Sequence, residues 1–184
     1  MKKFFCLHGL PRAGNTLLGS IINQNPKVAV TANSVIADML GELYILKHTD
    51  IFKNFPDHKS FDNVTKSLIQ TYYKDWPQDY IIDRNPWGFP INLKFLKRVQ
   101  DEIKIIVLVR DVSEILASFI KWSERESTSF VNQYAAKTIE EKCDMLMNQK
   151  GQIVKELIGI KHLLDHQPKE MYHIVEYNDL CDDP

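Results

Sequence analysis

The sequence has little of what marks secreted, membrane-spanning or nucleic-acid-binding proteins. It holds three cysteines in 184 residues, and its formal net charge of −1 comes from basic residues scattered along the chain. No apolar run approaches the length of a membrane span, and the run that follows Met1 is too short for a signal peptide. We therefore expect no disulfide framework, no nucleic-acid partner and no membrane partner, and we predict a cytoplasmic protein.

The three cysteines, Cys6, Cys143 and Cys181, also lack the spacing of metal ligands. This pattern favours reduced thiols and predicts no metal site. Hydrophobic residues make up 44% of the chain, which is enough for a buried core. Because no repeat, low-complexity tract or linker interrupts the sequence, we expect residues 1–184 to form a single domain.

Short apolar runs alternate with longer segments of helical periodicity. The predicted strands span 3–7, 28–30, 80–83, 103–109 and 171–177. The predicted helices span 15–23, 35–46, 61–73 and 89–99, with another that begins at Asp111 and a stripe within 134–164 that breaks near Gly151. This alternation predicts an α/β fold with three layers, in which helices cover both faces of a mostly parallel central sheet. The run 103–109 is typical of an inner strand, and ligands are expected at the carboxyl ends of the strands.

The loop Gly9 to Thr16 follows the first predicted strand. It has the glycine spacing and terminal hydroxyl of the nucleotide-binding P-loop, G-x-x-x-x-G-K-[ST], but Asn15 replaces the lysine. Converging backbone N–H groups and the positive end of the next helix would bind an anion, and Arg12 is the nearest cation. The loop predicts phosphate binding and disfavours ATP hydrolysis of the ordinary P-loop kind.

Three segments together resemble a known family. Residues 4–18, FFCLHGLPRAGNTLL, resemble the 5′-phosphosulfate loop of sulfotransferases that use 3′-phosphoadenosine-5′-phosphosulfate (PAPS). Residues 105–111, IIVLVRD, with Ser118 beyond them, resemble the family's 3′-phosphate-binding strand and helix. Residues 177–180, YNDL, resemble its Tyr-Glu-Asp-Leu segment, whereas residues 45–75 have no counterpart. The style of the motifs is similar to the tyrosylprotein and bacterial branches.

The resemblance implies a P-loop-containing nucleoside triphosphate hydrolase-like fold and a sulfuryl donor, PAPS, with adenosine 3′,5′-bisphosphate as product and no metal. The acceptor would be a hydroxyl or amine of a small molecule, glycan or peptide. The implied cofactor-binding residues are Arg12, Ala13, Gly14, Asn15, Thr16 and Leu17 on the 5′ side, Arg110 and Ser118 at the 3′-phosphate, and Tyr177 at the nucleotide.

The turn 83–86 resembles a family segment, Asp/Asn-Lys-x-Pro, whose lysine stabilises the leaving group. Arg84 stands in that place, so the resemblance implies catalytic roles for Arg84 and Arg12. A family glutamate that acts as general base is replaced by Asn33, which cannot take up the acceptor's proton. The remaining candidates for the base are His8, Asp38, Glu42 and Asp83.

Two other functions stay open at this point. One is a P-loop kinase-like phosphotransferase, against which Asn15 and the absence of a clear Walker B acid both count. The other is a nucleotide-binding relative without catalysis, which Asn33 favours. The family usually continues beyond the position of Pro184 with a helix and a basic loop, so we expect a domain that is short at its C-terminus.

Overall fold

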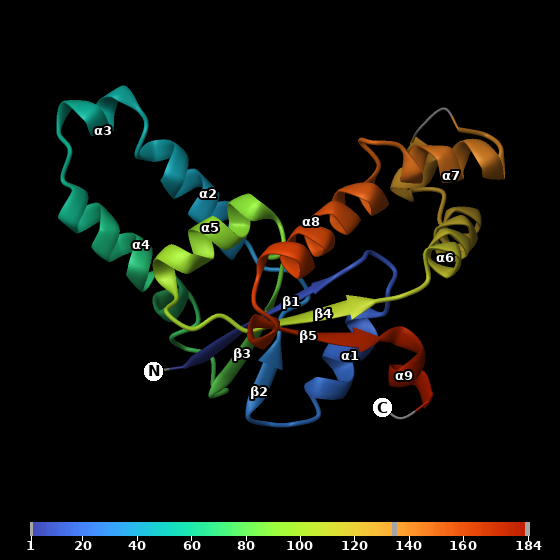
Figure 1. The fold of residues 1–184 in the computed structure, drawn as a ribbon, viewed down its shortest axis with the longest axis horizontal. Helices are drawn as coiled ribbons and strands as arrows, with labels where there is room; N and C mark the ends of the chain where they lie inside the picture. The colour runs from blue at the N-terminus through green and yellow to red at the C-terminus, as the bar shows by residue number, and fades with distance from the viewer. Residues whose placement is uncertain (1, 134–135, 183–184) are drawn as a thin grey trace.

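The protein is built on a five-stranded parallel sheet (Figure 1). The structure is a computed structural model, and it describes residues 2–133 and 136–182. The strand order is β2-β3-β1-β4-β5. The strands are β1 (Lys3–Gly9), β2 (Val28–Val30), β3 (Tyr80–Arg84), β4 (Ile105–Val109) and β5 (Tyr172–Glu176). Every predicted strand is present, although β4 begins two residues later than expected and β5 is one residue shorter at each end.

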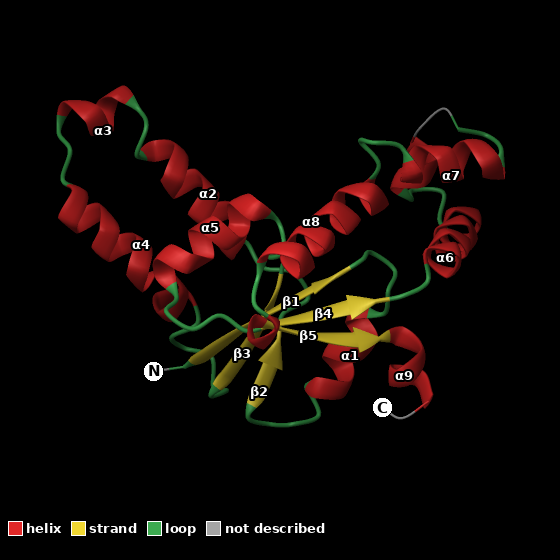
Figure 2. Cartoon of the chain, in the orientation of Figure 1, coloured by secondary structure: helices red, strands yellow, loops and turns green. Residues whose placement is uncertain are grey.

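Helices lie on both faces of this sheet. Figure 2 shows α1 on one face and α5 and α8 on the other, which confirms the predicted three-layer α/β fold. The helices are α1 (Asn15–Ile22), α2 (Ile36–Leu46), α3 (Asp50–Asn54), α4 (His58–Tyr72), α5 (Pro90–Val99), α6 (Val112–Arg125), α7 (Ile139–Met147), α8 (Gln152–His166) and α9 (Tyr177–Asp182), with short 3-10 turns at Phe130–Gln133 and Lys169–Met171.

The core is centred on β1 and β4. Leu7 on β1 and Val107 and Leu108 on β4 are fully buried, because each strand has a neighbour on both sides and helices above and below. The prediction of an inner strand at β4 is confirmed, and β1 occupies the centre of the order. The carboxyl ends of β1, β3 and β4 therefore lie next to one another, where the phosphate loop begins.

Several helix ends differ from the predictions for local reasons. Helix α4 begins at His58 rather than residue 61, because the Asp57 carboxylate accepts a hydrogen bond from the Ser60 amide at 3.0 Å. The predicted break near Gly151 is present, and a side chain there would collide with the Leu146 carbonyl oxygen. The part of the predicted stripe at Tyr134 lies outside the described residues.

Two further local features differ from what the sequence pattern indicates. Between the predicted helices 35–46 and 61–73, where no element was predicted, the chain forms the short helix α3, which the Thr49 side chain caps. At α6 the Asp111 side chain accepts a hydrogen bond from the Ser113 amide, but the sequence pattern Asp111–Glu114, which is typical of a capping box, does not form one, because Glu114 pairs with Arg110. Together α2, α3 and α4 form a helical arm that extends away from the sheet (Figure 1, upper left). No helix in the described part of the chain is long and apolar enough to cross a membrane.

Candidate active site

The loop between β1 and α1 has an unusual backbone. Arg12 has φ 65° and Gly14 has φ 98°, and both values lie in the left-handed region. A non-glycine residue in this region is uncommon and often marks a functional turn. A Cβ atom at Gly14 would also lie 2.6 Å from the Tyr177 ring, so no other residue fits there without displacing Tyr177.

Hydrogen bonds inside the loop brace it around one carbonyl. The Leu10 oxygen accepts from the Ala13 amide at 3.1 Å and from the Asn15 side-chain amide at 2.8 Å. Asn15 is thus buried in the loop, where a P-loop lysine would reach out to phosphate. The amides of Asn15, Thr16 and Leu17 begin α1 and have no acceptor within the helix, so they are available to an anion.

A cavity of about 560 Å³ opens at the carboxyl edge of the sheet. Its lining includes every residue that the resemblance implies for binding PAPS except Ala13. Ala13 is fully buried, and its amide already donates to the Leu10 carbonyl. Arg84 lines the same cavity. The full lining is Pro11, Arg12, Gly14, Asn15, Thr16, Leu17, Arg84, Arg110, Ser118, Phe119, Trp122, Gln152 and Tyr177.

Arg110, directly after β4, is held in place on three sides. Its Nε donates to the Glu114 carboxylate at 2.8 Å and its Nη1 donates to the Arg12 carbonyl at 3.2 Å. The guanidinium lies over the Tyr177 ring, with its carbon 3.9 Å from the ring centroid. This arrangement joins the phosphate loop, α6 and α9, and it orients Arg110 before any ligand binds.

The Arg12 side chain turns from the loop toward α6. Its Nε donates to the Ser118 hydroxyl at 3.2 Å, and its guanidinium lies 5.6 Å from the centroid of the Trp122 ring. A second cavity of about 360 Å³ adjoins here, lined also by Lys121 and Arg125.

Lys121, Trp122 and Arg125 were not predicted as site residues. A signal for them exists, because they follow Ser118 at helical spacings of three, four and seven and so share its face of α6. Phe119 and Gln152 in the larger cavity were missed as well, and no motif marks them.

Arg84, the last residue of β3, contributes a further cation. It is partly buried beside the end of β1, and this burial lowers the pKa of its guanidinium, although an arginine of this kind stays charged. Among the described residues no carboxylate lies within ion-pair distance of it. Its charge is therefore available to a ligand in the cavity.

The turn around Arg84 is braced by the segment that follows β2. The Arg84 amide donates to the Thr31 hydroxyl at 2.8 Å, and the Asn85 side chain donates to the Ser34 hydroxyl at 2.8 Å. The segment 31–34 corresponds to the place of the family glutamate, which Asn33 replaces. Here its hydroxyl groups position the Arg84 turn, and Asn33 is exposed.

Two of the four candidates for the general base are buried and fully engaged. The Asp83 carboxylate accepts from the Tyr73 hydroxyl, from Asn85 Nδ2 at 2.7 Å and from Trp87 Nε1 at 3.0 Å. His8 Nδ1 accepts from the Gly88 amide at 2.8 Å, so His8 Nε2 carries the proton and donates to Glu156 at 2.9 Å. Neither side chain lines the donor cavity.

The other two candidates, Asp38 and Glu42, lie on the exposed side of α2. They are also not among the residues that line the donor cavity. In the described part of the chain, no group of three or more His, Cys, Asp or Glu side chains is arranged to hold a metal ion. The cavity offers guanidinium groups, hydroxyl groups and backbone amides, a donor set that suits a polyanion.

This fold and donor set are those of a protein that can bind a polyanion, and the comparisons identify the family. The model of the sulfotransferase family matches residues 5–184, so the chain belongs to that family, a family of transferases. A comparison with curated protein sequences gave no match.

Solved structures agree at the level of the fold. Similar structures include the sulfotransferase domain from the curacin biosynthetic pathway, with 15% identity and a TM-score of 0.64, and the sulfotransferase domain from the Synechococcus PCC 7002 olefin synthase, with 17% and 0.61. A sulfotransferase from Alicyclobacillus acidocaldarius has 13% identity and a TM-score of 0.57. Each similarity spans 100% of this chain, and 69%, 69% and 76% of the respective structures.

Proposed function

We propose that this chain transfers a sulfuryl group from PAPS to a hydroxyl or amine acceptor. One observation supports the proposal most directly: the residues whose free amides begin α1 line a single cavity together with Arg110, Ser118 and Arg84. PAPS has two anionic groups, and this cavity gathers donors from the phosphate loop, from the end of β4 with α6, and from the end of β3. Membership of the sulfotransferase family supports the choice of reaction.

Each part of the cavity has a role in the proposal. The amides of Asn15, Thr16 and Leu17 would hold the 5′-phosphosulfate, while Arg110 and Ser118 would hold the 3′-phosphate. The Arg12 guanidinium, which contacts Ser118 in this structure, would turn to the 5′-phosphosulfate when the donor binds. Lys121 and Arg125 in the adjoining cavity add positive charge on the 3′ side. Tyr177, which already supports Arg110, would contact the nucleotide.

PAPS would supply the activated sulfuryl group, which passes to the acceptor as the bond between sulfur and the 5′-phosphate oxygen breaks. Arg84 and Arg12 would stabilise the negative charge that grows on the bridging oxygen. The loop would keep the reacting groups in line. The acceptor's proton needs a base, and of the four candidates only Asp38 and Glu42 have acceptor oxygens that no described residue engages.

A specific observation also supports nucleotide binding without transfer. None of His8, Asp38, Glu42 and Asp83 is among the residues that line the donor cavity. A kinase-like reaction has less support, because the Asn15 side chain points to the Leu10 carbonyl and supplies no cation to a transferring phosphate. Sulfuryl transfer and nucleotide binding without transfer both require that the chain bind PAPS or its product, so binding and turnover must be measured separately.

Calorimetry tests the binding part of the proposal. Adenosine 3′,5′-bisphosphate should bind with one-to-one stoichiometry, and the affinity should be the same in EDTA as in Mg²⁺. ATP with Mg²⁺ should bind more weakly, because it lacks the 3′-phosphate that Arg110 and Ser118 would contact. Preference for ATP with Mg²⁺ over the bisphosphate would overturn the proposal.

Mass spectrometry tests the transfer itself. The protein is incubated with PAPS and with sets of phenols, alcohols, amines, glycans and tyrosine peptides. The expected result is one sulfated product class together with an equal amount of adenosine 3′,5′-bisphosphate. Tight bisphosphate binding with no product from any acceptor would favour the binding protein over the enzyme.

A further inference from the structure

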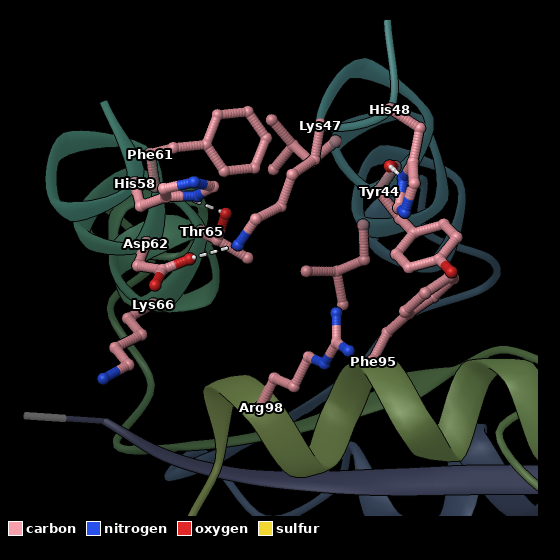
Figure 3. Close-up of a pocket in the computed structure, with 12 residues that line it drawn as sticks. Tyr44, Lys47, His48, His58, Phe61, Asp62, Thr65, Lys66, Phe95 and Arg98 are labelled. Atoms are coloured by element: carbon pink, nitrogen blue, oxygen red, sulfur yellow. Dashed lines mark hydrogen bonds and ion pairs between the residues drawn. The ribbon is translucent and has the colours of Figure 1, made fainter. Parts of the chain in front are cut away.

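A separate cavity of about 540 Å³ lies between α2, α4 and α5, at the base of the helical arm (Figure 3). None of the residues assigned to the donor cavity lines it. Figure 1 shows the arm on the opposite side of the molecule from α6 and α9, which flank the donor cavity. We call this space the arm cleft, and its lining is Leu40, Leu43, Tyr44, Lys47, His48, His58, Phe61, Asp62, Thr65, Lys66, Phe95 and Arg98.

The walls of the arm cleft are apolar and aromatic. Leu40 on α2 and Phe95 on α5 are buried at its base, and the Tyr44 ring lies 5.1 Å from the Phe95 ring between centroids. Phe61 faces them from α4 (Figure 3). A space of this size with three aromatic rings suits the body of a small organic molecule better than an inorganic ion.

The charged side chains of the arm cleft leave an excess of positive charge. Asp62 is the one carboxylate in its lining, and it already pairs with Lys47 at 3.0 Å, a contact that helps to hold the pKa of Asp62 below its ordinary value. In the described part of the chain, neither Arg98 nor Lys66 has a carboxylate within ion-pair distance. Asp62 therefore offsets only part of the charge of Lys47 and Lys66, and Arg98 keeps no carboxylate partner among the described residues.

Arg98 is the cation best placed to meet a ligand. Figure 3 shows its guanidinium rising from α5 into the space between α2 and α4. Its central carbon lies 5.7 Å from the centroid of the Tyr44 ring, so the charge sits beside an aromatic wall. A guanidinium in this position can form two parallel hydrogen bonds to a carboxylate or sulfonate.

We propose that the arm cleft binds an amphipathic organic anion, with its ring or chain against Tyr44, Phe61 and Phe95 and its single anionic group on Arg98. The apolar walls account for the body of such a ligand, and the unpaired guanidinium accounts for its charge. The site is distinct from the donor cavity and does not depend on the function proposed for that cavity.

Calorimetric titration with naphthalene-2-sulfonate tests the site. The donor cavity is first saturated with adenosine 3′,5′-bisphosphate, so that its cations are occupied. The sulfonate should then bind with one-to-one stoichiometry. Inorganic sulfate and neutral 2-naphthol should bind at least about tenfold more weakly, because sulfate lacks the aromatic rings and 2-naphthol lacks the anionic group. Arg98→Ala should weaken sulfonate binding about tenfold or more.

Matched variants separate this site from general attraction between charges. Lys94→Ala removes a cation one helical turn earlier on α5, also beside Tyr44 at 5.8 Å but outside the lining, and should leave binding unchanged. Leu43→Trp keeps every cation and fills the space, so it should block binding, and it tests the site independently if Arg98→Ala fails to fold.

Three results would overturn the proposal: no saturable binding of the sulfonate, equal losses in Arg98→Ala and Lys94→Ala, or unchanged binding in Leu43→Trp. If the bisphosphate itself does not bind, the sulfonate titration is repeated on Arg110→Ala. Binding that survives Arg110→Ala and is lost in Arg98→Ala would still support the arm cleft. Loss in Arg110→Ala alone would assign the sulfonate to the donor cavity.

Discussion

The two arginines Arg110 and Arg84 of the donor cavity differ in the contacts that their side chains make before any ligand binds. Arg110 is held by Glu114, by a carbonyl and by the Tyr177 ring. Arg84 has a braced backbone and a side chain without a carboxylate partner in the described part of the chain. In the proposed reaction Arg110 meets the 3′-phosphate, whose charge does not change, whereas Arg84 meets the bridging oxygen, whose negative charge grows in the transition state. These two residues should therefore differ in which step they affect.

Arg110→Ala should weaken binding of adenosine 3′,5′-bisphosphate by about 1.5–3 kcal/mol, the loss expected for a charge-assisted contact. Calorimetry measures the change. The matched control is Arg98→Ala in the arm cleft, which removes the same charge and should bind the bisphosphate as wild type does. An affinity equal to wild type in Arg110→Ala would disprove its assignment to the 3′-phosphate.

Arg84→Ala should lower kcat by roughly 10²–10³ and leave bisphosphate affinity nearly unchanged, because its cation acts on charge at the leaving oxygen. Steady-state kinetics with an accepted substrate measure the effect, and Arg84→Lys should recover part of the rate. Thermal unfolding of both variants provides the control for stability. Unchanged kcat in a folded Arg84→Ala protein would remove the residue from the mechanism.

At the scale of elements, the phosphate loop works through its contacts with other parts of the chain. Gly14 is the N-cap of α1, and it lies against the Tyr177 ring at the start of α9. Tyr177 in turn supports Arg110 after β4. The loop, β4 and α9 therefore form one connected site, although the residues are far apart in sequence.

Gly14→Ala should abolish most bisphosphate binding. Its φ of 98° is strained for alanine, and the added methyl group would displace Tyr177 from beneath Arg110. Gly19→Ala on the same helix is the control, since its Cβ would make only an ordinary contact with Val30 at 3.4 Å and alanine favours helix by about 0.5–1 kcal/mol. Calorimetry and melting curves should separate the two variants; equal bisphosphate binding would contradict the role of the Gly14–Tyr177 contact.

At the scale of the whole molecule, a buried polar cluster ties the sheet to the helical layer. Asp83 on β3 accepts hydrogen bonds from Tyr73 at the end of α4 and from Trp87 before α5. Burial first, and then the neighbouring Asp83 charge, raise the pKa of the Tyr73 hydroxyl above its ordinary value. The folded state thus keeps the Tyr73 proton at a pH where the unfolded chain releases it.

This shift has a definite sign in the pH dependence of stability. The unfolded chain binds fewer protons above the ordinary tyrosine pKa near 10, so the contribution of Tyr73 is complete below that pH and is lost as the pH rises above it. Tyr73→Phe leaves Asp83 short of a donor and should cost about 1–3 kcal/mol of unfolding free energy at pH 8.

Urea unfolding at several pH values measures that difference. The gap between wild type and Tyr73→Phe should narrow by about 1.4 kcal/mol for each pH unit above 10. Tyr72→Phe, at a neighbouring and more exposed tyrosine, should stay within about 0.5 kcal/mol of wild type throughout. A gap between wild type and Tyr73→Phe that is constant across this range would refute the argument.

Much of this protein could be predicted from local patterns. The apolar runs marked all five strands, and the spacing of Gly9, Gly14 and Thr16 marked the phosphate loop, because the apolar run of a strand and the glycine pattern of a loop are both local in sequence. The prediction failed where local signals are weak, as at α3, whose few residues carry no apolar period.

The sequence by itself determined the class of fold, the position of the anion-binding loop and the resemblance that the family comparison confirmed. Only the tertiary structure decided which residues meet. Strand order brings Arg84, Arg110 and Tyr177 to one edge, and the same packing encloses His8 and Asp83 in hydrogen bonds away from it. The physical reason is that a side chain's partners depend on elements distant in sequence, and no local pattern encodes that proximity.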